Sequence, residues 1–344
     1  MPDITLESLT IDSIPADASM DTASSISCWM RCQKLHEYKY SLGYRMAETI
    51  PAYLIGTAVH IGLESFWNGD SFTGAMASVV KFMQGEPYFS DAGKIERARI
   101  YAYLKGYYAR WGKDLENYSV IGVEGEFSRT VRDVSGSRIA AGKLDALVRR
   151  KSDGQLIIIE HKTAGAFSKA DDPSSPYWTK LSMDNQSCSY VHHIEELTGE
   201  RPLIMYDIVL KSRSTPLKSR KRKKKDETDA EFQLRIAGDN ESIQEYQARL
   251  ANKYVEECST RYFRQVVNIT SNELEMKIDE LNQVAQQIHS NTDKIRIRNT
   301  TACSSFGSAC EFMGVCTGLE QLDDPKFMKK ETAHEELQQQ KEAQ

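Results

Sequence analysis

The chain has 344 residues, 40% of them hydrophobic, and a formal net charge of −5, which together indicate a folded protein with a buried core. No run reaches the ~18 apolar residues that a membrane-spanning helix needs, and residues 1–20 lack the basic-then-apolar pattern of a signal peptide, so a cytosolic location is expected. The negative charge gives no global attraction to nucleic acid; any DNA binding must come from local basic patches or bridging metal ions.

In chain order, the pattern predicts helices, then strands, then helices. Residues 1–22 are polar and irregular and are expected to be flexible, and a helix begins near Ser24 and Ser25, whose hydroxyls can cap it. Further helices are predicted at 55–67 and 94–118. The predicted strands cover residues 120–131, 139–149, 155–163 and 203–211, with a helix at 183–197 before the last of them.

The second half of the chain is mostly polar and helical. Residues 212–240 contain a run of lysine and arginine and are expected to form a solvated loop. Long helices are predicted at 241–267 and 271–291, and residues 319–344 are expected to be a disordered polar tail. No internal repeat is evident, so residues 23–318 are interpreted as one domain.

Two carboxylates and a lysine lie on neighbouring predicted strands joined by the polar turn 151–154. Asp145 is on the first strand, and Glu160 and Lys162 share one face of the second because strand side chains alternate. In one register of the turn Asp145 lies directly across from Glu160, and in the next it lies across from Lys162 with Glu160 diagonal. The carboxylates converge in either register.

Such a pair suits a hard divalent cation, because Mg²⁺ takes carboxylate oxygens together with water and substrate phosphate. The metal would activate a water, and the lysine ammonium would position that water or stabilise the charge on a scissile phosphate. The alternative is a surface hairpin with a cross-strand salt bridge. The four apolar residues at 156–159 favour the end of a buried strand instead.

This constellation resembles the PD-(D/E)xK nuclease superfamily and, within it, the RecB-like exonucleases, which include the AddB nuclease domain and the CRISPR adaptation nuclease. Further motifs of that family occur in its usual order over about residues 25 to 318. They are Gly56-Thr-Ala-Val-His60, a strand glutamate at Glu124 or Glu126, Gly142-Lys-Leu-Asp145, Glu160-His-Lys162 and Gln186-Ser-Cys-Ser-Tyr190.

The resemblance implies an α/β protein with a restriction-endonuclease-like core, a central mixed β-sheet flanked by helices. It also implies a Mg²⁺- or Mn²⁺-dependent deoxyribonuclease, an exonuclease acting on DNA ends or single strands in recombination, repair or phage DNA processing, in a bacterial or phage-infected cell. Lys162 would act on the attacking water. Gln186 and Tyr190 would hold the DNA backbone and the lysine, and Glu124 would be the auxiliary carboxylate. The implied metal ligands are His60, Asp145, Glu160 and the backbone carbonyl of His161.

Seven cysteines in a cytosolic-looking chain favour metal ligation or free thiols over disulfides. The resemblance implies a [4Fe-4S] cluster that joins the N-terminal and C-terminal helical segments, with Zn²⁺ as the alternative. Cys28, one helical turn earlier, is an alternative to the upstream ligand. The implied ligands are Cys32, Cys303, Cys310 and Cys316.

The basic run has a plain interpretation as a solvated loop, but in a nuclease it is also predicted to contact phosphate. The predicted DNA contacts are Lys218, Arg220, Lys221, Arg222 and Lys223. Three other functions stay open. These are a catalytically silent DNA-binding or assembly subunit, a CRISPR spacer-processing nuclease, and a zinc-dependent hydrolase that uses the cysteines.

Overall fold

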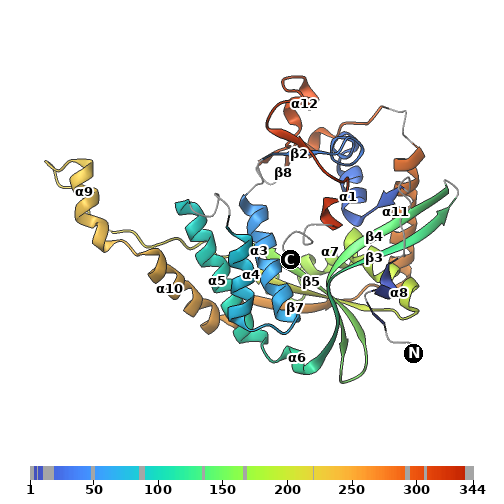
Figure 1. Cartoon of the computed structure of the whole chain (residues 1–344), viewed down its shortest axis with the longest axis horizontal. Coiled ribbons are helices and arrows are strands. Elements are labelled where there is room, and N and C mark those ends of the chain that lie inside the picture. The colour runs from blue at the N-terminus through green and yellow to red at the C-terminus, as the bar shows by residue number, and fades with distance from the viewer. Residues whose placement is uncertain are drawn as a thin grey trace.

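A mixed β-sheet with helices on both faces forms the centre of the computed structural model (Figure 1), as the sequence predicts. The strands follow the order β1-β4-β5-β6-β7, and β3 also pairs with β4. The described residues are 4–5, 7–10, 19–47, 51–84, 90–133, 136–165, 169–219, 221–290, 295–305 and 308–337. The strands of the sheet are β1 (Met20–Asp21), β3 (Tyr118–Asp133), β4 (Gly136–Arg150), β5 (Leu156–Ala164), β6 (Leu203–Leu210) and β7 (Tyr262–Val267).

The two faces of the sheet are covered by different helices because strand side chains alternate. Ile157 and Ile159 of β5 face one core, whereas Leu156 and Ile158 face the other. The first core is covered by α3 (Pro51–Trp67), α4 (Phe72–Phe82), α5 (Asp91–Trp111) and α10 (Ile243–Glu256). The second is covered by α7 (Pro176–Ser182), α8 (Asn185–Thr198) and α11 (Ser271–Ser290).

The hairpin between β4 and β5 takes the first of the two predicted registers. Ala146 pairs with Ile159 and Arg149 with Leu156, and the two strands run antiparallel. Gly154 closes the turn at φ 74°, a left-handed conformation that glycine adopts without a Cβ penalty. This register brings Asp145 and Glu160 to the same end of the hairpin.

Two predicted helices are wrong at their C-terminal ends. The helix expected at 94–118 ends at Trp111, a short α6 (Asp114–Asn117) follows, and Tyr118 begins β3. The helix expected at 241–267 ends at Glu256, and its last part is the strand β7. The tyrosine and valines of β7 suit a strand, but the strand forms only against its partner β6, which is distant in sequence.

The chain ends pack more fully than the sequence predicts. Within the segment expected to be flexible, Leu9 of a short 3-10 helix (Glu7–Leu9) is buried, and β1 pairs with β4. Within the tail expected to be disordered, β10 (Phe327–Lys329) pairs with β2 (Tyr44–Met46). Thr22, rather than Ser24 or Ser25, is the N-cap of the first helix, and Ser25 completes its capping box. The remaining elements are α1 (Ala23–Arg31), α2 (Gln33–His36), a π-helix (Glu37–Ser41), 3-10 helices at Ala237–Asp239, Cys258–Thr260, Thr300–Ala302 and Glu335–Leu337, β8 (Ser304–Ser305), β9 (Ser308–Ala309) and α12 (Met313–Thr317).

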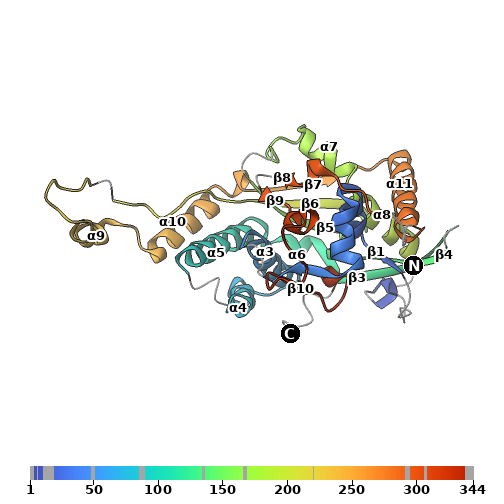
Figure 2. The ribbon, with the colours of Figure 1, turned by 90° about the horizontal axis from the view of Figure 1, so that it is seen from above.

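The basic segment forms an extended arm, here residues 211–242, that projects from the body of the protein (Figure 2). Its tip carries α9 (Asp229–Ile236), which opens with a capping box made by Thr228 and Glu231. Ion pairs within the arm join Lys221 to Asp239 and Lys223 to Asp229 at 2.7 and 2.6 Å. No described helix is both long enough and apolar enough to cross a membrane.

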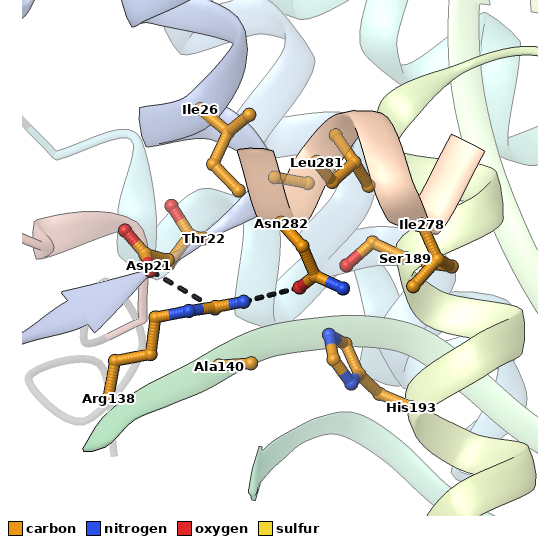
Figure 3. A pocket seen from close by; sticks show the side chains of 11 residues that line it. Asp21, Thr22, Ile26, Arg138, Ala140, Ser189, His193, Ile278, Leu281 and Asn282 are labelled. Carbon is orange, nitrogen blue, oxygen red and sulfur yellow. Dashed lines mark hydrogen bonds and ion pairs between the residues drawn. The ribbon is translucent and has the colours of Figure 1, made fainter. Parts of the chain in front are cut away.

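A small cavity lies between α1, α8, α11 and β4 (Figure 3). Arg138 crosses it and bonds Asp21 at 3.2 Å, while Asn282 and His193 also face it. Its volume is about 20 Å³, which is room for about one water molecule. The cavity is therefore part of the packed interior and no substrate site.

Candidate metal centre

His60, Glu124 and Asp145 place one ligand atom each within 4.8 Å of one another, the only such group of histidine, cysteine or acidic residues found in the described part of the chain. They come from α3, β3 and β4, respectively. His60 Nδ1 lies 3.2 Å from Asp145 Oδ1. Two carboxylates and an imidazole are suitable donors for a divalent cation, so these residues could hold one.

Glu124, and not Glu126, belongs to this group, although the two alternate positions look equal in the sequence. Glu124 has a φ of 50°, a left-handed conformation that few non-glycine residues adopt. Its neighbours Val123 and Gly125 remain paired with β4, so the surrounding ladder holds the distorted residue in place. Such backbone strain costs about 1–3 kcal/mol and clusters at functional sites.

The charges in this group are strongly coupled. Burial, together with the nearby Asp145 carboxylate, raises the pKa of Glu124 to about 7, against the opposing effect of Lys143, whose Nζ lies 3.0 Å from Glu124 Oε2. Burial alone would raise the pKa of Asp145, but His60 and His161 together lower it below its usual range. Burial lowers the pKa of His60, and the Asp145 carboxylate more than reverses that effect. A cation between these carboxylates would relieve their mutual repulsion.

Glu160 lies beside this group in a separate hydrogen-bonded chain. Gln186 donates to Glu160 Oε2 at 2.9 Å and accepts from Lys162 Nζ at 2.7 Å, and its amide also donates to the Tyr190 hydroxyl at 3.3 Å. Glu160 Oε1 is buried without a partner, and burial together with Asp145 raises the pKa of Glu160 well above its usual value. The structure thus brings the predicted Asp145, Glu160 and Lys162 into one region. Within it, Asp145 lies closest to Glu124 and His60.

Two features of this region were not predicted from the sequence. Lys143, inside the motif that ends at Asp145, pairs with Glu124. Gly142 has no room for a side chain, because a Cβ there would lie 2.5 Å from the Phe127 ring and 2.7 Å from the Tyr190 ring. The spacing of the motif was visible in the sequence, but the rings that crowd the glycine come from other elements.

The cysteines near both chain ends gather in one region. Cys28, Cys32, Cys310 and Cys316 pack around a small core of Leu35, Tyr38, Phe312 and Phe327. The main-chain N–H of Cys310 donates to the Cys303 carbonyl at 2.8 Å, and Asn299 N–H donates to Cys32 Sγ at 3.5 Å. Burial raises the pKa of Cys28 to about 11. Among the described residues, no three of these sulfur atoms lie within 4.8 Å of one another.

The basic run is not brought to the metal centre, because the arm extends away from the sheet (Figures 1 and 2). Lys218 and Arg222 are exposed, and Lys221 and Lys223 pair with acidic residues of the arm. Arg220 lies outside the described residues.

A crystal structure of a provisionally assigned exonuclease from Eubacterium rectale superposes with a TM-score of 0.46 and 13% identity, covering 88% of this chain and 89% of that one. The crystal structure of SSO0001 superposes with a TM-score of 0.35 and 11% identity, covering 85% and 84%. No curated protein sequence matches this chain. The sequence profile of the PD-(D/E)XK nuclease superfamily matches residues 22–317, and the chain belongs to that superfamily.

Proposed function

We propose that this protein is a Mg²⁺- or Mn²⁺-dependent deoxyribonuclease whose metal centre contains His60, Glu124 and Asp145. The main support is that one ligand atom from each of these three residues lies within 4.8 Å of the others, in a chain of the PD-(D/E)XK nuclease superfamily. Glu160, with its unpartnered buried Oε1, is the fourth donor, and the backbone carbonyl of His161 is the fifth. The donor chemistry and the raised pKa values of Glu124 and Glu160 fit a bound cation.

The residues around the metal centre have distinct roles in phosphodiester hydrolysis. When bound, the metal ion supplies an activated water and neutralises charge on the scissile phosphate. Gln186 holds the Lys162 ammonium near Glu160, where it can orient the attacking water. Tyr190 supports Gln186 from the same face of α8, and because its side chain is only 7% exposed its role is to hold Gln186 rather than to contact the DNA backbone.

We further propose that the substrate is DNA with an accessible end or a single-stranded segment, in the manner of RecB-like exonucleases acting in recombination, repair or phage DNA processing. The support is the order of the motifs from His60 to Tyr190 and the presence of the cysteine region. Cleavage of CRISPR spacer precursors is the alternative within the same chemistry.

The cysteine region is proposed to hold a [4Fe-4S] cluster on Cys32, Cys303, Cys310 and Cys316. The support is that Cys32, Cys310 and Cys316 pack around one small core, to which Cys303 is joined by the main-chain hydrogen bond from Cys310. A cluster there would tie α1 and α2 to the C-terminal segment. Zn²⁺ on the same thiolates is the alternative, and anaerobically purified protein distinguishes the two, because thiolate-to-iron charge transfer absorbs visible light and zinc is colourless.

The arm is proposed to add phosphate contacts at a distance from the metal centre. Lys218, Arg222, Lys224 and Lys225 are exposed there, and no ion pair to an acidic side chain is found for them among the described residues. Lys221 and Lys223 are held by acidic residues and would have to exchange those partners for phosphate. Such contacts carry no sequence information and strengthen binding at low salt.

The test of the nuclease is hydrolysis of labelled single-stranded and double-stranded DNA with defined 5′ and 3′ ends, in Mg²⁺ and in Mn²⁺. Lys162→Ala is expected to slow cleavage by at least about 100-fold, whereas Lys180→Ala, at an exposed lysine of α7, should cleave like the wild type. DNA binding without cleavage by the wild type in any metal would favour the silent DNA-binding or assembly subunit.

A further inference from the structure

A row of buried polar residues crosses three strands behind the candidate metal centre. His161 on β5 lies directly across from Asp207 on β6, and Asp207 lies directly across from Arg264 on β7. Their side chains are 3%, 0% and 7% exposed, respectively. The row therefore lies within the apolar core beneath α3 and α5, where unpaired charges would be costly.

Asp207 and Arg264 are held by each other and by aromatic residues. Asp207 Oδ2 accepts hydrogen bonds from the Tyr107 hydroxyl at 2.5 Å and from Arg264 Nη2 at 2.7 Å. Arg264 also pairs with Asp114, and its guanidinium stacks 4.1 Å from the centre of the Trp111 ring. Asp207 consequently has little freedom to move.

The ring of His161 is oriented by one hydrogen bond and one nearby charge. The indole N–H of Trp67 donates to His161 Nε2 at 3.0 Å. Because an indole nitrogen can only donate, Nε2 is the acceptor, and the proton of the neutral ring is on Nδ1. That nitrogen lies 3.6 Å from Asp207 Oδ2, beyond hydrogen-bond distance, and has no hydrogen-bond partner among the described residues. The tautomer therefore follows from Trp67, and the Asp207 carboxylate acts on the ring as a neighbouring charge.

The main chain of His161 connects this row to the metal centre. Its N–H donates to Asp145 Oδ2 at 2.7 Å, while Asp145 Oδ1 faces His60. A shift of the His161 backbone would therefore turn the Asp145 carboxylate away from His60 and Glu124. A buried ion pair such as Asp207–Arg264 contributes little to stability compared with apolar residues of similar size, so fold stability alone does not explain it.

We infer that Tyr107, Asp207, Arg264 and Trp67 are positioning residues that act through His161 to hold Asp145 in its metal-binding orientation. The inference rests on the proposed metal centre. It predicts that a substitution in this row weakens metal binding. The accompanying loss of fold stability should be too small to account for that weaker binding. Partners that orient metal-binding groups typically contribute about 10-fold to 100-fold to metal affinity or activity.

Two tyrosines form a matched pair for the test. Tyr107 and Tyr246 are both fully buried in the same core. The Tyr107 hydroxyl donates to Asp207 and accepts from Arg264 at 3.1 Å. The Tyr246 hydroxyl donates to the Ser214 carbonyl at 2.7 Å and accepts from Arg99 at 3.3 Å. Replacing either by phenylalanine removes one hydrogen bond that the hydroxyl donates and one that it accepts from an arginine, but only Tyr107 touches the row, where its acceptor is the Asp207 carboxylate.

The experiment measures Mn²⁺ binding by titration calorimetry, the Mn²⁺ concentration that gives half-maximal DNA cleavage, and the thermal unfolding of each variant. Tyr107→Phe is expected to raise the Kd and the half-saturating Mn²⁺ concentration about tenfold, with a smaller loss of kcat at saturating Mn²⁺. Trp67→Phe, which keeps an aromatic ring but loses the N–H, should do the same. Tyr246→Phe should leave both quantities unchanged.

Equal Mn²⁺ affinity in the Tyr107→Phe and Tyr246→Phe proteins would overturn the inference, and so would a loss of affinity that merely follows the loss of thermal stability. Asp207→Asn serves as the stronger variant, because it leaves Arg264 paired with Asp114. A wild-type protein that binds no Mn²⁺ would overturn the proposed metal centre itself, a result separate from any difference between variants.

Discussion

The side-chain amide of Gln186 accepts a 2.7 Å hydrogen bond from the Lys162 ammonium, and thereby sets where that charge lies. The same amide donates to Glu160 Oε2 at 2.9 Å, so one side chain of α8 bridges the two polar residues at the end of β5. Lys162 Nζ is 4.0 Å from Glu160 Oε2, which is too long for a direct hydrogen bond. The helix, and not a direct ion pair, therefore orders the lysine.

We expect Gln186→Met to slow DNA cleavage by about 10-fold to 100-fold, because two of the hydrogen bonds that it removes are to the Lys162 ammonium and the Glu160 carboxyl, and a hydrogen bond to a charged group contributes about 1.5–3 kcal/mol. Initial rates at saturating Mn²⁺ measure the effect. Tyr190→Phe should have a smaller effect, since the 3.3 Å hydrogen bond with Gln186 is the longest of the three that Gln186 makes. A Gln186→Met protein that cleaves at the wild-type rate would contradict the role given to the bridge.

Gly142→Ala should destabilise the fold by about 1–3 kcal/mol, the usual cost of overpacking a core. The added Cβ would meet the rings of Phe127 and Tyr190, neither of which can move without disturbing β3 or α8. Urea unfolding followed by circular dichroism gives the free energy of unfolding. Gly238→Ala is the control, because nothing lies within 4 Å of a Cβ there. Equal stability of the two variants would show that a Cβ at position 142 does not clash with the two rings.

Cys303→Ser, Cys310→Ser and Cys316→Ser are each expected to lose bound iron, measured as visible absorbance and iron content after anaerobic purification. Cys258→Ser should retain it, because Cys258 packs against the core beneath α3 and α5 and not in the cysteine region. Comparing Cys28→Ser with Cys32→Ser identifies the upstream ligand. A colourless wild-type protein that contains stoichiometric zinc would replace the iron–sulfur proposal by the zinc alternative.

Replacing Lys224 and Lys225 together by alanine should weaken DNA binding without changing kcat, because both are on the arm, which extends away from the metal centre. The slope of log Kd against log salt should fall by about one for each phosphate that the protein no longer binds. Fluorescence anisotropy at several salt concentrations gives this slope. The double variant Lys113→Ala/Lys180→Ala, at two exposed lysines of the body, is the control. An unchanged slope in the arm variant would argue for a merely solvated arm.

The buried His193 side chain should make the free energy of unfolding depend on pH. Burial first, and then the neighbouring His192, hold its pKa well below the ordinary 6.5 in the folded protein. The unfolded chain therefore binds more protons between the two pKa values. The stabilising contribution is complete above about pH 6.5 and is lost as the pH falls toward the folded pKa, by at most about 1.4 kcal/mol per pH unit.

His193→Gln should reduce this dependence, as measured by urea unfolding at about pH 7.5 and about pH 5.5. The side chain lines the small cavity of Figure 3, whose lining includes none of His60, Glu124 and Asp145, so cleavage of DNA at neutral pH should change little. An identical fall in stability for wild type and variant would mean that other groups account for the acid sensitivity.

Local patterns in the sequence predicted the hairpin of β4 and β5 and the shared face of Glu160 and Lys162. A polar turn and the twofold alternation of strand side chains are properties of short segments, so they can be seen without the fold. The motif order also predicted the PD-(D/E)XK nuclease superfamily, which the profile match over residues 22–317 confirms, whereas the RecB-like group within it stays a prediction. The family resemblance implied a mixed sheet flanked by helices, and the structure has one.

Only the tertiary structure chose Glu124 over Glu126, turned the end of a predicted helix into β7, and paired β10 with β2. It also placed Asp207 and Arg264 beside His161. Each of these depends on a partner from a distant part of the chain. By itself the sequence determined the superfamily, the candidate metal-binding residue types and the local turns, whereas pairing between distant strands decided which side chains share the buried site.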